Sequence, residues 1–373
     1  MALKTRTGRQ IAVLTLAVLG VGPPLAVAET AAPPARLTKV ASFPHQVTGV
    51  TVSETGRTFV NFPRWTEDNA VSVAELKDGQ LRPYPDAEWN TWRNARKDDV
   101  SAKDHWVCVQ SVVADQRGSL WVIDPAAPAM ATVVENGPKL VQIDLKTDHV
   151  VRTIAFDTSI APQGSYLNDV RISPDGRTAY LTDSGAKGAL VVVDLERGSA
   201  TRVLDGDPST QPDKSVTVKV DGKPLRRPDG RGVEFSADGL ALSTDGKTLY
   251  WQAIKGKNLY SVPTESLVTG KDVQSTVAVV GENGPADGLL ISRHDGLMYV
   301  SSPEDGSVKS RDLSSAGNAL KTVVRDKRLH WPDTFAEGPD GTIYFTTSHI
   351  QDSAFYKPSA PASLPTELWS IAR

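Results

Sequence analysis

Short runs of β-branched and aromatic residues recur along the chain and are separated by turns rich in Gly, Asp and Pro. No long stretch has the spacing of apolar positions that predicts an amphipathic helix. One phrase returns: a polar residue, a hydrophobic strand, a turn ending in Gly, and a strand with an aromatic residue. It is clearest at residues 168–181 and 238–251, with weaker copies at 50–59, 111–121, 287–299 and 333–344. The pattern predicts an all-β protein.

Each copy contains a glycine that ends a tight hairpin, where a positive φ costs little only for this residue. These glycines are Gly56, Gly118, Gly176, Gly246, Gly296 and Gly341. Two further strands usually follow, as at residues 189–195 and 200–204. Six units of four antiparallel strands predict a six-bladed β-propeller. A pair of β-sandwiches does not explain six copies of one four-strand phrase.

The last unit ends at residues 368–372, its third strand, and lacks a fourth. Residues 37–41 form a candidate strand near the other end of the chain. We predict that this strand completes the last blade and closes the ring, because closure removes an exposed sheet edge.

Residues 1–28 have the pattern of a secretory signal peptide. Lys4, Arg6 and Arg9 precede a short apolar run, and a small-x-small site ends at Ala28. We expect cleavage there and secretion to the periplasm or the exterior, with a retained N-terminal anchor as the alternative. Residues 29–373 are then a single propeller domain.

Composition adds three limits. The net charge of −3 becomes −6 without residues 1–28, which hold three basic and no acidic residues. An acidic body argues against non-specific nucleic-acid binding. The single cysteine, Cys108, excludes an internal disulfide and lies in an apolar strand, which indicates a buried thiol. We expect a monomer that does not associate with membranes after cleavage.

Four long insertions interrupt the short connections, at residues 86–105, 124–138, 205–230 and 351–364. In a propeller of this order all four fall on the face where the innermost strands begin. Long loops gathered on one side of a rigid scaffold indicate a binding face. The alternative is that these loops have drifted in length without a function, because loops tolerate insertions. Trp89, Trp92 and Trp106 flank the first insertion and either line a pocket or fix the loop.

A polar residue stands eight positions before five of the turn glycines and nine before Gly296. The six are Thr48, Gln110, Asn168, Asp238, Asp287 and Asp333. This position opens the innermost strand, so we expect the side chains to surround the channel mouth and to bind a small cationic or aromatic molecule, or a metal. Asn168, Asp238 and Asp287 are the candidate metal ligands, for Ca, Zn or Mn. The alternative is that the Asp-Gly pairs form turns. We found no nucleophile elbow, phosphate loop or His metal motif.

Most of residues 29–373 resembles the bacterial branch of the Yellow/major royal jelly protein family. The matching segments include residues 60–65, 84–90, 137–141, 164–170, 238–243, 247–251 and 331–334. The resemblance implies a six-bladed propeller, export, and a small-molecule pocket in the central channel. Insect members resemble binders of biogenic amines or sterols, and the family carries a dopachrome-tautomerase label.

The chain also resembles the regucalcin/gluconolactonase-type propellers, which hold a divalent metal at inner-strand starts. Asn168 and Asp287 match two of their ligands, and Asp238 stands where that family has Asn. The first-blade Glu is missing, because Thr48 stands there. This likeness implies a metal-dependent lactonase, in which the metal acts as a Lewis acid or activates water. An interaction scaffold without a small-molecule site is the third possibility.

Overall fold

The structure is a computed structural model that describes residues 1–3, 8, 36–65, 68–314, 318–359 and 364–372. The chain divides into two units, residues 1–34 and 35–373. The apolar run and cleavage point of the expected signal peptide lie outside the described residues. No helix in the described ranges is both long and apolar enough to cross a bilayer.

Six four-stranded antiparallel sheets make up the second unit, as the sequence predicts. Blade 1 consists of β2 (Val50–Val52), β3 (Thr58–Asn61), β4 (Val73–Lys77) and β5 (Gln80–Pro83). Blade 2 consists of β6 (Ser111–Ala114), β7 (Ser119–Asp124), β8 (Lys139–Asp144) and β9 (His149–Ala155). Blade 3 consists of β10 (Leu167–Ile172), β11 (Thr178–Asp183), β12 (Ala189–Asp194) and β13 (Ser199–Val203).

Blades 4 and 5 consist of β16 (Ala237–Leu242), β17 (Thr248–Ala253), β18 (Asn258–Pro263) and β19 (Ala278–Glu282); and β20 (Leu289–Ile291), β21 (Met298–Ser302), β22 (Ser307–Arg311) and β23 (Lys321–Arg325). Blade 6 consists of β24 (Pro332–Glu337), β25 (Ile343–Thr347), β26 (Thr366–Ala372) and β1 (Arg36–Phe43).

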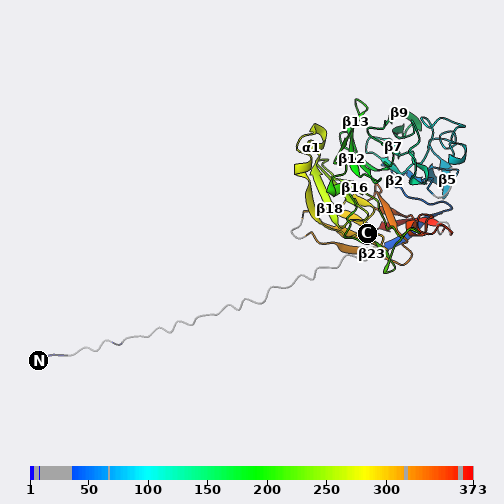
Figure 1. Cartoon of the computed structure of the whole chain (residues 1–373). Helices are drawn as coiled ribbons and strands as arrows, with labels where there is room; N and C mark the ends of the chain where they lie inside the picture. Colours follow the sequence, from blue (N-terminus) through cyan, green and yellow to red (C-terminus); the bar gives the residue numbers. More distant parts are fainter. Residues whose placement is uncertain (4–7, 9–35, 66–67, 315–317, 360–363, 373) are drawn as a thin grey trace. The chain divides into compact units, whose positions relative to one another are not determined.

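The ring closes as the sequence predicts. The N-terminal strand β1 pairs antiparallel with β26 along its length, with Leu37 opposite Ile371 and Phe43 opposite Thr366. Figure 1 shows β1, in blue, beside the red C-terminal strands. The innermost strands β2, β6, β10, β16, β20 and β24 contact one another in that order, and β24 contacts β2. Because the first and last strands share a sheet, the two ends of the propeller domain hold the ring together.

Helical elements are few and short. One α-helix, α1 (Thr264–Thr269), follows β18, and a small hairpin of β14 (Lys219–Val220) and β15 (Lys223–Pro224) lies in the insertion before blade 4. Single 3₁₀ turns complete the described elements: η1 (Asn94–Arg96), η2 (Pro128–Met130), η3 (Pro208–Thr210), η4 (Gln274–Thr276) and η5 (Ile350–Asp352).

The six turn glycines all have positive φ, between 72° and 84°. Each ends the tight link from the first to the second strand of its blade, so these links share one face of the ring. We call this the hairpin side. The innermost strands begin on the opposite face, which we call the loop side.

All four long insertions meet on the loop side, as expected. Each contributes side chains to a single buried apolar cluster, to which Trp92, Val133, Val218 and Tyr356 belong, one from each insertion. The rigid blades thus carry a shared apolar layer over the starts of the inner strands.

Candidate functional site

The predicted polar ring lies at the starts of the inner strands. Asn168, Asp238 and Asp333 each occupy the second position of their strand, while Gln110 and Asp287 stand just before theirs. The pairing of β10, β16 and β24 with their neighbours shifts register at these residues. Such bulges re-aim a side chain, and here they turn the polar groups toward the channel.

The glycines that follow two ring residues allow the blades to approach closely. A Cβ on Gly239 would stand 2.0 Å from the carbonyl oxygen of Asp287, and one on Gly288 would stand 2.0 Å from that of Asp333. Neither glycine has a positive φ, and Gly239 lies inside β16. The Asp-Gly pairs therefore serve inter-blade packing and are not turns. Each glycine brings its own aspartate close to the next one around the ring.

A small pocket lies where these residues meet. Its polar floor contains five of the six predicted residues, namely Gln110, Asn168, Asp238, Asp287 and Asp333. We call the last three the carboxylate cluster. The cavity volume is about 10 Å³, which is room for about one water molecule or ion.

Thr48 does not line this pocket. Its hydroxyl donates to the carbonyl of Gln110 (3.3 Å) and accepts from the side-chain amide of Asn61 (2.9 Å). The amide of Asn61 also occupies the space beside Gly49. Thr48 therefore ties blade 1 to blade 2 and presents no group to the mouth.

Apolar and aromatic side chains roof the pocket. We call them the cap: Trp65, Met130, Tyr166, Phe235, Ile254 and Ile350. All belong to, or pack against, the apolar cluster to which the long loops contribute. The mouth is consequently buried, and the carboxylate cluster is only 4–5% exposed. The sequence predicted a polar rim, but not this apolar roof.

Hydrogen bonds connect the cluster to its neighbours. Asn168 Nδ2 donates to Asp238 Oδ1 (2.9 Å), and Trp331 Nε1 donates to Asp287 Oδ2 (2.6 Å). The carboxyl groups of Asp238 and Asp287 also interact directly, which adds to the rise in the pKa of Asp238 and opposes the rise in the pKa of Asp287. Trp331 reaches Asp287 from a left-handed backbone conformation with φ 59°. For a bulky, fully buried residue this is a strained conformation of the kind that clusters at functional sites.

Burial is the main reason why the pKa values of the cluster are raised. It raises the pKa of Asp287 to about 7, against the opposing hydrogen bond from Trp331. Burial and then the charge of Asp287 raise the pKa values of both Asp238 and Asp333 well above the usual range. Across the described ranges, no Lys or Arg forms an ion pair with any of the three. The cluster thus lacks a positive charge that would stabilise its ionised form.

Two residues of the site, Tyr166 and Asp169, were not among the predicted site residues. Tyr166, which lies in one of the segments that match the family, donates its hydroxyl to Gln110 Oε1 (3.0 Å) and accepts from Trp65 Nε1 (2.5 Å). Asp169 lies one step below the mouth, where burial raises its pKa and Arg171 stands 3.4 Å away. The sequence held one signal for Asp169: it is a polar residue on an inner strand, one position after the ring residue Asn168.

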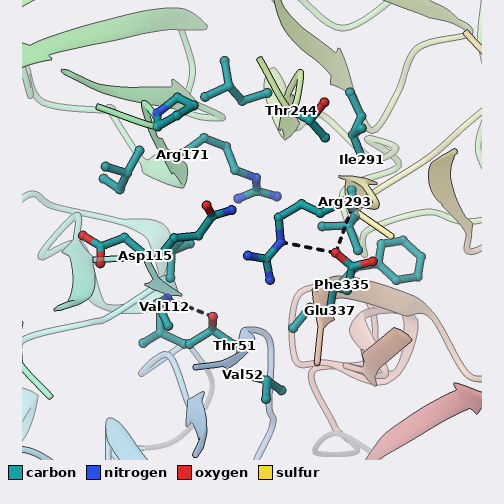
Figure 2. A pocket seen from close by; sticks show the side chains of 18 of the residues that line it. Thr51, Val52, Val112, Asp115, Arg171, Thr244, Ile291, Arg293, Phe335 and Glu337 are labelled. Carbon is teal, nitrogen blue, oxygen red and sulfur yellow. Dashed lines mark hydrogen bonds and ion pairs between the residues drawn. The ribbon is translucent and has the colours of Figure 1, made fainter. Parts of the chain in front are cut away.

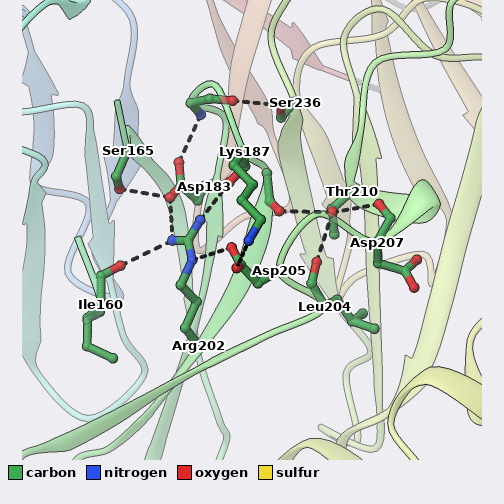
Figure 3. A network of polar contacts seen from close by, with 12 residues as sticks. Ile160, Ser165, Asp183, Lys187, Arg202, Leu204, Asp205, Asp207, Thr210 and Ser236 are labelled. Carbon is green, nitrogen blue, oxygen red and sulfur yellow. Dashed lines mark hydrogen bonds and ion pairs between the residues drawn. The ribbon is translucent and has the colours of Figure 1, made fainter. Parts of the chain in front are cut away.

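Buried ion pairs fix the loops that lead into the site. Asp183, the last residue of β11, accepts from the backbone N–H of Tyr166 (2.8 Å) and the hydroxyl of Ser165 (2.8 Å), and pairs with Arg202 (2.5 Å). Figure 3 shows the Arg202 guanidinium between Asp183 and the carbonyl of Ile160. The network holds Tyr166 over the pocket.

Blade 2 repeats the arrangement at the same strand end. Asp124 accepts from the backbone N–H groups of Val107 (2.7 Å) and Cys108 (2.9 Å) and pairs with the fully buried Lys139 (3.0 Å). The thiol of Cys108 is buried, which raises its pKa to about 12, as expected for a structural cysteine. These contacts fix the segment that leads to Gln110.

The three tryptophans of the first insertion fix the loop. The rings of Trp89 and Trp106 are 4.4 Å apart, and Trp106 donates to the carbonyl of Tyr84 (2.9 Å). Trp92 is buried beneath the guanidinium of Arg64. None of the three lines the pocket.

The oxygen donors present are of the type that Ca²⁺ and Mn²⁺ prefer. Asn168, Asp238 and Asp287 adjoin one cavity of ion size, so the chemistry of the donor set fits a hard divalent cation. Within the described ranges, however, no three His, Cys, Asp or Glu side chains converge as a metal-binding group. A metal that binds here would have to favour the ionised forms of Asp238 and Asp287, whose pKa values are raised.

Comparison with known families agrees with this architecture. The family model for the major royal jelly proteins matches residues 107–353. The chain belongs to this family. Major royal jelly protein 1 of Apis mellifera is 25% identical over 232 residues, which is 55% of this chain and 49% of that protein. This royal jelly family member therefore spans about half the length of the curated relative that it matches.

Solved structures show the same fold at low identity. A calcium-binding protein, regucalcin, from Agrobacterium tumefaciens is 15% identical with a TM-score of 0.52, covering 90% of this chain and 94% of that one. A gluconolactonase from Xanthomonas campestris is 13% identical with a TM-score of 0.53, covering 90% and 89%. The royal jelly family member thus shares its propeller fold with these two proteins.

Proposed function

We propose that the protein binds a small organic cation, an ammonium group on an apolar body, at the carboxylate cluster beneath the cap. One observation carries this proposal: three buried carboxyl groups adjoin one cavity, and no cationic side chain pairs with them in the described part of the chain. A bound ammonium supplies the missing charge and hydrogen-bond donors. The aromatic side chains of Trp65, Tyr166 and Phe235 provide a surface for the apolar body and for cation–π contact.

Binding requires the cap to open, because the cavity holds only about one water molecule. The loop between β7 and β8, which carries Met130, is suited to this movement. Ala126, Ala129, Met130 and Asn136 in this loop all have positive φ, between 51° and 57°. Non-glycine residues in this conformation store strain, and strain favours rearrangement when a ligand enters.

Binding of phenethylamine tests this proposal, with phenethyl alcohol as the neutral match of the same shape. We expect only the amine to raise the melting temperature. At a hundredfold excess over the dissociation constant, it should add about 2.7 kcal/mol to the free energy of unfolding. Asp287→Asn should abolish the effect, and Asp340→Asn, on an exposed turn, should preserve it. Equal stabilisation by the alcohol would contradict a cation site.

A metal-dependent lactonase is the second candidate, favoured by the oxygen donors of Asn168, Asp238 and Asp287. These residues would hold the metal, which supplies Lewis-acid chemistry when bound. Lactone hydrolysis that requires added Ca²⁺ or Mn²⁺, and that Asn168→Ala and Asp287→Asn both eliminate, would favour this candidate. If neither amine nor metal binds, the interaction scaffold is the better interpretation.

Export is part of the proposed function. The basic residues, apolar run and small-residue site within residues 1–28 support it. The intact mass of the protein recovered from outside the cytoplasm should correspond to a chain that begins at Glu29. Recovery of the full-length chain in the membrane fraction alone would contradict export.

A further inference from the structure

A second, larger pocket lies at the other end of the channel, on the hairpin side. It is lined by the ends of the inner strands of all six blades, and its cavity volume is about 190 Å³. This is below the roughly 300–1,000 Å³ of pockets for drug-sized ligands, so it suits a smaller molecule. The carboxylate cluster and the cap do not contribute to it.

Two arginines project into this pocket. Figure 2 shows the guanidinium groups of Arg171 and Arg293 pointing into it from opposite walls. Arg171 is 14% exposed, and its Nη2 donates to the carbonyl of Leu289 (2.9 Å), across the channel in blade 5. Arg293 pairs with Glu54 through Nη1 (2.6 Å) and with Glu337 through Nε (3.4 Å). Both guanidinium groups are therefore held in place before any ligand arrives.

Each arginine keeps donors available. The protein contacts of Arg171 use Nη1 and Nη2, and those of Arg293 use Nε and Nη1. Within the described residues, Nε of Arg171 and Nη2 of Arg293 have no protein acceptor. A guanidinium has five N–H donors in a planar fork that matches a carboxylate.

The two carboxylates that line the pocket are already engaged. Asp115 accepts from the backbone N–H groups of Arg117 and Ser119 and from the indole of Trp121, within its own hairpin. Glu337 accepts from the hydroxyl of Ser292 and the backbone of Arg293. Neither is directed at the free donors of the arginines. The remaining lining includes a third arginine, Arg117, and is otherwise largely apolar: Val52, Val112, Ile172, Leu242, Ile291 and Phe335.

We propose that the hairpin-side pocket binds a small carboxylate with an apolar body, held by Arg171 and Arg293 with its body against the apolar wall. The negative charge of a carboxylate complements the guanidinium groups of Arg171 and Arg293, and the apolar lining favours an organic anion over an inorganic one. The protein would then have two small-molecule sites of opposite charge preference at the two ends of one channel.

Calorimetric titration of the full mature chain with benzoate tests this proposal, with neutral benzamide as the matched ligand. We expect benzoate alone to bind, and Arg293→Gln to weaken it about tenfold or more. Thr244→Trp fills the pocket from an exposed turn and should block binding with both arginines intact. Arg325→Gln, an exposed arginine outside the pocket, should change nothing.

The asparagine substitution Asp287→Asn should leave benzoate binding unchanged, which separates this site from the proposed cation site. Benzamide binding as tightly as benzoate, unchanged binding in both Arg293→Gln and Thr244→Trp, or binding of inorganic phosphate in place of benzoate would overturn the proposal. So would the absence of benzoate binding to the unaltered protein.

Discussion

Asp238 and Asp287 come from neighbouring blades, and their carboxyl groups interact directly at the mouth of the channel, which adds to the rise in the pKa of Asp238. Gly239 makes this possible, because a side chain there would collide with the backbone of Asp287. Two carboxyl groups so close in a buried site do not both ionise without a compensating cation. We therefore expect the pair to hold a proton in the unliganded protein and to become fully ionised when a cation binds.

The pH dependence of stability should report this pair. The folded-state pKa values of Asp238, Asp287 and Asp333 are raised above their unfolded values, so the folded protein retains protons that the unfolded chain releases. The contribution of Asp287 to stability is present at low pH and is lost as the pH rises from about 4 through about 7, and the contributions of Asp238 and Asp333 are lost as the pH rises through their own raised pKa values.

Asp287→Asn cannot ionise, and it should therefore be more stable than the wild type at pH 8 by roughly 1–4 kcal/mol, with a smaller gain at pH 5. Asp340→Asn is the control: the pKa of Asp340 is lowered by bonds from Thr342, so this change should give no gain at pH 8. Urea unfolding at both pH values measures the difference, and equal gains at the two pH values would rule out the ionisation argument.

The indole of Trp331 should lower the pKa of Asp287, because its N–H bond stabilises the ionised form. Trp331→Phe removes this donor and keeps most of the ring. We expect the pKa of Asp287 to rise further, seen as a shift of the pH-dependent stability loss to higher pH. Trp92→Phe, a buried tryptophan outside the pocket, should not shift that profile. A profile unchanged by Trp331→Phe would contradict the assigned hydrogen bond.

Close packing between blades should make Gly239 intolerant of a side chain. Gly239→Ala places a methyl group 2.0 Å from a neighbouring carbonyl oxygen, so we expect a loss of about 1–3 kcal/mol. Gly232→Ala meets its nearest atom at 3.5 Å and should change stability by less than about 0.5 kcal/mol. Chemical denaturation measures both, and a neutral Gly239→Ala would show that the blades can separate there.

Closure of the ring by β1 should carry much of the stability of the domain. Deleting residues 29–42 exposes the edge of β26, so we expect aggregation or a fall in melting temperature of about 10 °C or more. Deleting residues 29–35 leaves the paired strand intact and should have little effect. A monomeric and equally heat-stable protein after the longer deletion would contradict the closure.

The repeat explains how much of the fold the sequence could predict. Turn glycines such as Gly176 need a positive φ, so they mark the hairpins and give the number of blades. Counting back from them locates Asn168, Asp238, Asp287 and Asp333, because the spacing between the ring position and the turn glycine is nearly constant from blade to blade. The local sequence was therefore sufficient to predict the number of blades and the positions of these four residues.

Other features depend on contacts between residues far apart in the chain. Thr48 satisfies the same count but is held by Asn61, and no local pattern reveals that bond. The six side chains of the cap come from segments far apart in the chain, and only Met130 lies in a long insertion, so the burial of the mouth was not predictable from the insertions alone. The arginines of the hairpin-side pocket likewise come from different blades, with Arg171 in β10 and Arg293 beyond β20.

The most direct test of the cation site is a calorimetric titration with phenethylamine in two buffers of different ionisation enthalpy. A cation that binds beside Asp238 and Asp287 favours their ionised forms, so it should bind with proton release, and more tightly as the pH rises from about 5 to about 8. Asp287→Asn should remove both effects. Absence of binding, or binding of the same strength and proton count in Asp287→Asn, would contradict the account.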